Sequence, residues 1–172
     1  IDYILNVPNI FQVDREGKVE ASEGTILDRL INLDKRGELR DEDINSCLHQ
    51  IFTNVRIKRF IEVRGADRPP LGYEMAPVAF WTGVLTEDSI RKKILDETST
   101  WSYEDRIKFN NASLSLDDNV LTVKDKKYSY WNSWFGELAI SGLKKRGLGE
   151  EVLFEKFFKI VSEKGPFSLQ LQ

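Results

Sequence analysis

Hydrophobic and polar positions change their spacing several times along the first part of the chain. Between Tyr3 and Val13, β-branched and aromatic residues interrupted by Pro8 predict two short strands, or one edge strand with a break. The polar stretch 14–18 is typical of a turn, and Val19 begins a short return strand. The chain is therefore expected to open with a small group of strands.

Two amphipathic helices are predicted after these strands. The first follows Thr25, a typical N-cap residue, and its apolar side chains recur at helical spacing from Ile26 to Ile31. The second starts at about Asp41, and its apolar positions form one stripe, so the single cysteine is expected to face a core. That stripe consists of Ile44, Cys47, Leu48, Ile51 and Phe52.

Between residues 55 and 64 the apolar period changes from helical spacing to strict alternation. Alternate side chains of a strand point to opposite sides, so this segment predicts one strand with two different faces. Gly65, Pro69 and Pro70 end the element. One face carries Val55, Ile57, Arg59, Ile61 and Val63, and the other carries Arg56, Lys58, Phe60, Glu62 and Arg64.

Beyond the prolines the pattern is mainly helical. Ser102 and Asp105 form a capping-box pattern, and Gly165 with Pro166 marks the end of the last helix. With strands early and helices late, the layout is α+β. We expect one domain over 1–172, with a sheet-forming part containing two helices at 1–70 and a mainly helical part at 71–172. The expected helices cover 73–85, 86–97, 103–113, 131–147 and 149–165, and a strand-like interlude covers 119–130.

Composition excludes several classes of function. At 172 residues and 41% hydrophobic content, the chain can form one compact core. Its net charge of −3 gives no general positive field for nucleic acid or acidic membrane, and no apolar run approaches the ~20 residues that span a bilayer. One cysteine excludes an internal disulfide and fits a reducing compartment, so we expect a cytoplasmic protein with neither nucleic acid nor membrane as a partner.

The charged face of segment 55–64 carries the densest candidate chemistry. A carboxylate between cations, as at Glu62, can help to hold Mg²⁺, and the guanidinium forks of Arg56 and Arg64 suit phosphate. Together with Lys58, these groups point to phosphoryl transfer. The alternative is ordinary: antiparallel sheets often bury one face and expose mixed charges on the other.

Two further charged residues of this segment are assigned supporting roles. Arg59 intrudes on the apolar face, where a buried guanidinium needs a carboxylate or backbone carbonyls as partners. Asp67, just past Gly65, is the next acid along the chain after Glu62; its alternative role is that of a turn residue satisfying its own backbone.

Other residues with reactive or binding side chains favour structural roles. The only histidine, His49, lies off the apolar stripe of its helix, so a solvated side chain is favoured over a general base. Trp81, Trp131 and Trp134 are interpreted as packing residues. The basic run at 143–147 is typical of a helix C-terminus, with a phosphate clamp as the lesser alternative.

The run from Phe52 to Asp67 resembles a signature of the glutamate–cysteine ligases, especially those of plants and proteobacteria. The resemblance covers roughly residues 10–85, and the helical remainder only in outline. A run of matches in register is far more specific than a short isolated motif. Departures from the pattern fall at Cys47, where the family has His, at Thr53-Asn54, where it has Pro-Glu, and at Pro69-Pro70. The matching residues are Phe52, Val55, Arg56, Lys58, Arg59, Glu62, Arg64, Gly65, Ala66, Asp67, Pro77, Phe80, Trp81 and Gly83.

This resemblance implies an ATP-dependent carboxylate–amine ligase with a glutamine-synthetase-like antiparallel sheet and a helical C-terminal half. ATP would phosphorylate the γ-carboxylate of glutamate, and the amino group of cysteine would attack to give γ-glutamylcysteine, the first step of glutathione synthesis. The resemblance implies that Glu62 is a Mg²⁺ ligand and that Arg64 contacts the transferring phosphoryl group. Lys58 and Arg56 are weaker candidates for phosphate binding on the same face.

Family members are much longer than this chain, and the sequence opens at Ile1 rather than Met. We therefore expect the C-terminal part of a larger ligase, with the N-terminal part of the same protein as its partner and with little activity by itself. Two alternatives stay open. One is a non-catalytic interaction or assembly module of the same fold, and the other is a ligase that uses a different amine.

Overall fold

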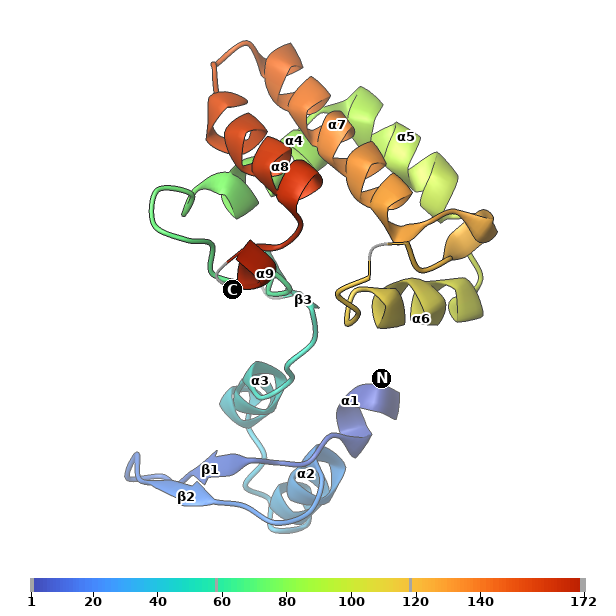
Figure 1. The fold of residues 1–172 in the computed structure, drawn as a ribbon. Coiled ribbons are helices and arrows are strands. Elements are labelled where there is room, and N and C mark those ends of the chain that lie inside the picture. Colours follow the sequence, from blue (N-terminus) through green and yellow to red (C-terminus); the bar gives the residue numbers. More distant parts are fainter. Residues whose placement is uncertain (1, 58, 118, 171–172) are drawn as a thin grey trace. The chain divides into compact units, whose positions relative to one another are not determined.

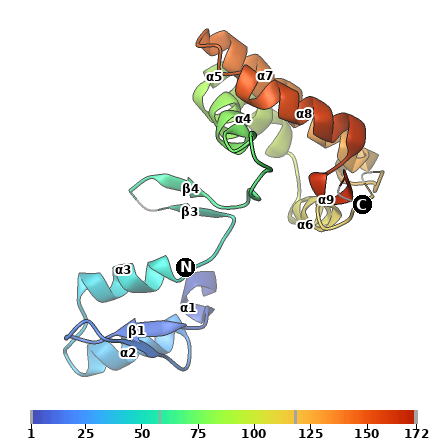
Figure 2. The ribbon, with the colours of Figure 1, turned by 60° about the vertical axis from the view of Figure 1, so that its left-hand side comes forward.

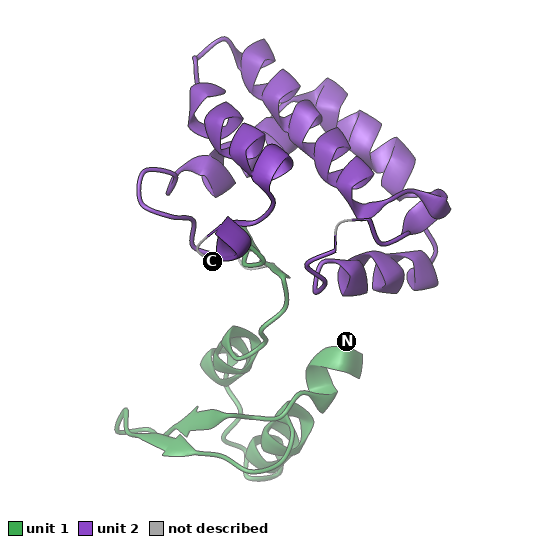
Figure 3. Cartoon of the chain, in the orientation of Figure 1, with its two compact units in different colours: residues 1–66 green, residues 67–172 purple. Residues whose placement is uncertain are grey.

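The computed structural model describes residues 2–57, 59–117 and 119–170. The chain divides into two compact units, residues 1–66 and residues 67–172 (Figure 3). The first unit contains all of the named strands in the described residues, and the second contains the longer helices. The α+β class is thus confirmed, whereas folding as one domain stays a prediction.

In its described residues, the first unit has three helices and two strand pairs (Figure 1). The two pairs are separate two-stranded antiparallel sheets, not parts of one sheet. In the first sheet Phe11 lies opposite Ala21, and in the second Val55 lies opposite Val63. The elements are α1 (Asp2–Asn6), β1 (Phe11–Val13), β2 (Val19–Ala21), α2 (Ile26–Lys35), α3 (Asp41–His49), β3 (Val55–Ile57) and β4 (Ile61–Val63).

A small core joins α1, α2 and α3. Cys47 is 1% exposed and packs with Ile26 and Ile51, which confirms that the cysteine faces a core. Ile4 of α1 and Val7, just after this helix, pack against the same cluster. The expectation of strand throughout Tyr3–Val13 is therefore wrong for the first residues. Helical spacing brings side chains three positions apart to one face, which alternation cannot do.

The stripe predicted on the second helix is only partly buried. Ile44, Leu48 and Phe52 are exposed, and Phe52 lies beyond the end of α3. The helix is instead fastened by Gln50, which is 1% exposed. Its Oε1 accepts from the amides of Ile10 and Phe11 at 2.9 and 3.0 Å, and its Nε2 donates to the Phe11 carbonyl at 3.0 Å. This amide clasp holds β1 against the C-terminal end of α3.

Both capping signals read from the sequence are confirmed. The Thr25 hydroxyl accepts from the Asp28 amide, and the Asp28 carboxylate accepts from the Thr25 amide at 2.8 Å, which closes a capping box. These hydrogen bonds lower the pKa of Asp28. Ser102 and Asp105 form the same reciprocal pair at the start of a helix in the second unit.

The predicted single strand over 55–64 is wrong. The structure has a hairpin, with β3 and β4 joined by a short connection between Ile57 and Ile61 (Figure 2). This connection carries none of the Gly, Asn, Asp or Pro residues that mark tight turns, so alternation continued through it in the sequence. The hairpin changes which charged residues meet.

The second unit is a helical assembly in which α7 packs against α4, α5 and α8 (Figure 1). Thr86 ends α4 and does not open the next helix, and the strand-like interlude is reduced to one isolated bridge between Leu121 and Lys127. In the part of the chain that the structure describes, no helix has the length and apolar character to cross a bilayer. The elements are α4 (Ala76–Thr86), α5 (Asp88–Thr98), α6 (Tyr103–Ala112), the 3₁₀ turn η1 (Val123–Asp125), α7 (Tyr128–Arg146), α8 (Val152–Lys164) and α9 (Phe167–Gln170).

The helices α4 and α7 of the second unit cross closely at two glycines. A Cβ added to Gly83 would lie 2.2 Å from the Ala139 carbonyl oxygen, and one added to Gly142 would lie 2.0 Å from the Gly83 carbonyl oxygen. Both are shorter than any ordinary carbon–oxygen contact. The backbones of the two helices therefore approach closely only because neither position carries a side chain.

We predict that Gly83→Ala destabilises the second unit by about 1–3 kcal/mol or more, because the new methyl group overpacks a rigid backbone contact. Urea unfolding followed by tryptophan fluorescence should show the loss, since Trp81, Trp101, Trp131 and Trp134 all lie in this unit. Val78→Ala is the control, because Val78 lies on the same helix and is exposed; it should change stability by less than about 0.5 kcal/mol. Equal stability of Gly83→Ala and the wild type would contradict the close crossing.

Candidate functional site

The β3–β4 hairpin places Arg56 directly opposite Glu62. Residues paired across an antiparallel ladder project to the same face, so the two side chains meet. Arg56 Nε donates to Glu62 Oε2 at 2.8 Å. Because Arg64 lies two residues beyond Glu62, it shares that face, and its Nη1 donates to Glu62 Oε1 at 3.3 Å. One carboxylate is thus held by a guanidinium on each side.

Arg56 is the buried member of this cluster, with its side chain only 11% exposed. Its Nη1 donates to the His49 carbonyl at 2.7 Å and lies 3.5 Å from the Ile51 carbonyl. These carbonyls belong to the last turn of α3 and the residues after it, where a cation is favoured by the helix dipole. Arg56 therefore joins the hairpin to the end of the helix and fixes the position of Glu62.

Arg64 is the more accessible member, with its side chain 32% exposed. Its guanidinium lies 5.1 Å from the centre of the Phe52 ring, a cation–π arrangement, and its amide donates to the Asn54 carbonyl at 2.7 Å. The sequence pattern placed Phe52 on the apolar stripe of the preceding helix, because its spacing matched that stripe. The contact between Phe52 and Arg64 was therefore not predicted. Arg64 is thus oriented by Phe52 on one side and Glu62 on the other.

The cluster as a whole carries two cations and one anion. Guanidinium groups bind phosphate or carboxylate by paired hydrogen bonds, so the exposed part of Arg64 is suited to an anionic group. A magnesium ion would need several oxygen ligands close together. Among the described residues, no group of three or more His, Cys, Asp or Glu side chains could hold a metal ion together. Glu62 by itself would be one ligand of a larger set.

The remaining residues predicted for this site do not converge on the cluster. Arg59 is exposed in the connection between the strands, so the expectation that it is buried on an apolar face is wrong. Asp67 is exposed beyond β4, at the first position of the second unit. Lys58 lies outside the described residues. The supporting roles of Arg59 and Asp67 stay predictions.

The interpretations of the histidine, cysteine and tryptophans agree with the structure. His49 is exposed at the end of α3. Burial raises the pKa of the Cys47 thiol, which disfavours the nucleophilic thiolate. Trp131 is buried, and Trp81 and Trp134 pack against core clusters of the second unit.

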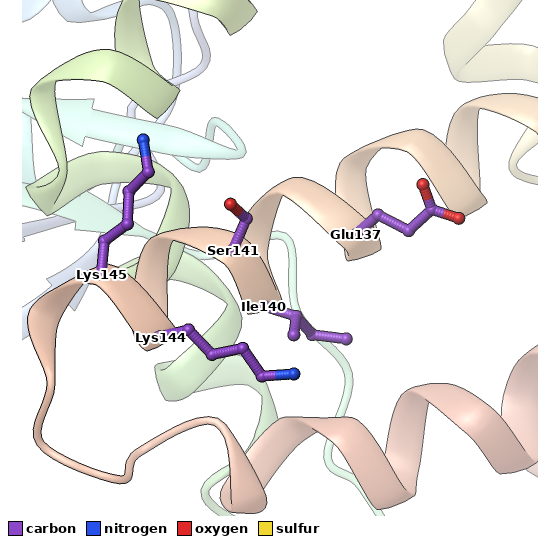
Figure 4. Close-up of a pocket in the computed structure, with 5 residues that line it drawn as sticks. All are labelled: Glu137, Ile140, Ser141, Lys144 and Lys145. Carbon is purple, nitrogen blue, oxygen red and sulfur yellow. The ribbon is translucent and has the colours of Figure 1, made fainter.

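The basic run at the end of α7 lines a shallow pocket of about 470 Å³, and its lysines point in different directions (Figure 4). Lys144 pairs with Glu155 of α8 at 2.6 Å, which raises the pKa of Lys144, and Lys145 donates to the Ser89 hydroxyl at 2.6 Å. Arg146 pairs with Glu150 at 2.6 Å. Each cation already has a partner, so this surface acts as a basic helix C-terminus that fastens neighbouring segments.

Comparison with known proteins places the chain in a family. A family model described as glutamate-cysteine ligase family 2 (GCS2) matches residues 1–163. The chloroplastic glutamate–cysteine ligase of Medicago truncatula is 29% identical over 164 residues, which is 94% of this chain and 32% of the relative. That of Arabidopsis thaliana is 31% identical over 153 residues, which is 87% of this chain and 29% of the relative.

The chain therefore belongs to the glutamate–cysteine ligase family, and the resemblance carried by 52–67 is confirmed. It spans about a third of the length of these relatives or less. Glutamate–cysteine ligase A, chloroplastic, of Oryza sativa subsp. indica is also similar, at 34% identity over 109 residues, which is 62% of this chain and 22% of the relative.

We predict that Glu62→Gln loosens the hairpin, because it leaves the mostly buried Arg56 without a charged partner. Charged hydrogen bonds of this kind are worth about 1.5–3 kcal/mol. The Arg64 amide donates to the Asn54 carbonyl, and its hydrogen exchange should become faster by the factor that this loss of free energy sets. Arg59→Gln, which removes an exposed cation of the same hairpin, should leave this exchange rate unchanged. Slow exchange in both variants would show that the ion pair does not hold the hairpin.

Proposed function

We propose that this chain is the C-terminal part of an ATP-dependent glutamate–cysteine ligase that forms γ-glutamylcysteine through γ-glutamyl phosphate. Membership of the family supports the reaction class, and the Arg56–Glu62–Arg64 cluster is the observation that supports a role for this chain in it. The glutamine-synthetase-like sheet belongs to the same proposal. The two separate strand pairs would then be parts of that sheet and not the whole of it.

The roles proposed within the cluster follow from charge and exposure. Arg64, partly exposed and oriented by Phe52, would neutralise charge on the phosphoryl group as it passes from ATP to the γ-carboxylate of glutamate. Arg56 would hold Glu62 in place through its anchor on α3. Lys58 would add a second cation near the phosphates, although it lies outside the described residues.

Magnesium supplies charge neutralisation to bound phosphates in reactions of this class. Glu62 would contribute one oxygen ligand to such an ion, and the other ligands would come from polypeptide outside this chain. Glu62 would then share its oxygens between the two arginines and the ion, and Arg64 could bind the phosphate that the metal binds.

The proposed substrates are glutamate, cysteine and ATP, and the proposed partner is the N-terminal part of the same protein. Neither nucleic acid nor membrane is part of the proposal. A cytoplasmic location stays a prediction; the relatives named above are chloroplastic. A ligase that uses a different amine is the nearest variant of this proposal, because no described residue has been assigned to an acceptor pocket.

One observation favours a second candidate, a non-catalytic assembly module of the same fold. In the described part of the chain Glu62 is engaged by arginines, and no cluster of metal-binding side chains accompanies it. A scaffold would need the ion pairs for stability and nothing further. The two candidates differ in whether Arg64 affects turnover.

The deciding measurement is ADP release by the natural full-length protein that carries this segment, with Mg²⁺, glutamate and cysteine each omitted in turn. We expect release to require all three, and the 172-residue chain alone to release none above background. No ADP release with any amine offered would favour the assembly module. Amine-dependent release by the isolated chain would show that the proposed division of ligands is wrong.

In the full-length protein, Arg64→Lys should lower kcat/KM by about 10²-fold or more, since a point charge cannot replace a planar fork that binds two oxygens. Arg59→Lys is the matched control, because it makes the same change at an exposed position of the same hairpin; its kinetics should be unchanged. Thermal melting of both variants separates a catalytic loss from unfolding. Wild-type kinetics in Arg64→Lys would make Arg64 a structural residue.

A further inference from the structure

The first unit contains a cavity of about 810 Å³ beside its first hairpin. Residues of β1 and β2, of α2, of the segment after α2 and of the start of α3 line it. Several charged side chains of this lining have close partners. Asp14 accepts from two backbone amides of its own turn at 2.9 and 2.8 Å, and Arg36 pairs with Glu38 at 3.2 Å. Arg29, which also lines the cavity, differs from them.

Arg29 is a buried arginine whose contacts are long. Its side chain is only 8% exposed, and its Nη2 lies 3.5 Å from Asp43 Oδ1. Its Nη1 lies 3.5 Å from Gln12 Oε1, so both distances are at the outer limit for hydrogen bonds. Arg29 Nε is buried, and among the described residues it has no hydrogen-bond partner. A guanidinium has five N–H donors and is costly to bury, so Arg29 lacks acceptors.

Asp43 is only partly available to Arg29, because it serves other donors. Its Oδ2 accepts from the Arg40 amide at 3.1 Å and lies 3.4 Å from both terminal nitrogens of Arg15. Two guanidiniums therefore share one carboxylate. A second carboxylate in the cavity would give Arg29 close acceptors and Arg15 another charged partner. Because both contacts of Arg29 are long, a small rotation would turn its donors toward that carboxylate.

The surroundings of the cavity favour a carboxylate carried by a polypeptide. Val13 lines the cavity and is 38% exposed, and it lies opposite Val19, which is 63% exposed. All three residues of β2 are exposed, and a two-stranded hairpin is marginally stable by itself in water. A free anion would leave these apolar side chains in water. A protein surface would cover them while one of its acids enters the cavity.

We infer that this cavity receives an Asp or Glu side chain from the N-terminal part of the same protein, with its carboxylate on Arg29 and Arg15. The inference rests on the proposed function for the identity of the partner, and it requires no turnover. Because this chain spans 32% of the length of the Medicago truncatula relative, the proposed partner is large enough to cover the hairpin.

The first test is cross-linking in the natural full-length protein that carries this segment. Arg15→Lys places a primary amine beside the cavity, and a carbodiimide joins an amine to a carboxylate that it contacts. We expect an amide bond between position 15 and an Asp or Glu outside the 172 residues, identified by mass spectrometry. Lys18 is the internal control, because it pairs with Glu20 at 2.8 Å and should cross-link within the hairpin.

The second test compares Arg29→Met in the 172-residue chain and in the full-length protein. In the 172-residue chain, hydrogen exchange of α2 should be unchanged or slower, because an apolar side chain replaces a poorly paired buried charge. In the full-length protein the same change leaves the partner's carboxylate unpaired, and exchange should become at least about tenfold faster. Lys18→Met removes an exposed cation of the same hairpin and should leave exchange unchanged in both.

Acetate is the probe for a free carboxylate. In the full-length protein it should leave the exchange of α2 unchanged, because the partner's acid already fills the cavity. Sodium chloride at the same ionic strength is the control for screening of charges. Slower exchange with acetate than with chloride would show that the cavity is open to free anions, and it would overturn the inference.

Two further results would also overturn the inference. Cross-links from position 15 only to acids of the 172 residues would show that no outside acid enters the cavity. Equal effects of Arg29→Met in the two proteins would show that Arg29 gains no partner in the longer one. A full-length protein that forms the cross-link but releases no ADP would contradict the proposed reaction and support this inference. ADP release without the cross-link would contradict the inference alone.

Discussion

The arrangement of the candidate site depends on one requirement, which is that the mostly buried Arg56 must be neutralised. A guanidinium removed from water is costly unless carboxylate and carbonyl oxygens replace its hydration. Glu62 supplies the carboxylate across the ladder, and the carbonyls at the end of α3 supply the rest. The hairpin, the helix end and the position of Glu62 are consequently set together, and Arg64 is oriented by the carboxylate that this requirement holds in place.

Behind the first hairpin a second buried arginine lies in the opposite situation. There Arg29 is buried to nearly the same extent but lacks close partners, and a cavity lies beside it. Both arginines lie in the first unit, and they differ in how close their carboxylate partners are. Arg56 has a contact of 2.8 Å to the Glu62 carboxylate, whereas Arg29 lies 3.5 Å from the Asp43 carboxylate. Arg56 is thus closely paired, whereas the buried Nε of Arg29 has no hydrogen-bond partner among the described residues.

The sequence predicted some parts of the site correctly for reasons that are local. Glu62 and Arg64 share a face because they are two residues apart in a strand, and that holds whether the strand is long or short. Arg59 was predicted on the wrong side because alternation was carried through the connection between Ile57 and Ile61. The contact between Phe52 and Arg64 was missed because helical spacing placed Phe52 on α3, one turn beyond where the helix ends.

By itself, the sequence determined the α+β class, the positions of α2 and α3, the capping boxes, the burial of Cys47 and the family. These features depend on neighbours within a few positions, or on a run of matched residues, and both can be read along the chain. Only the tertiary structure decided that 55–63 folds back on itself, that Gly83 meets Gly142, and that Arg29 lies beside a cavity. Each of these brings together groups distant in sequence or separated by a turn without a marker. Their energies come from packing and charge burial, which no local pattern records.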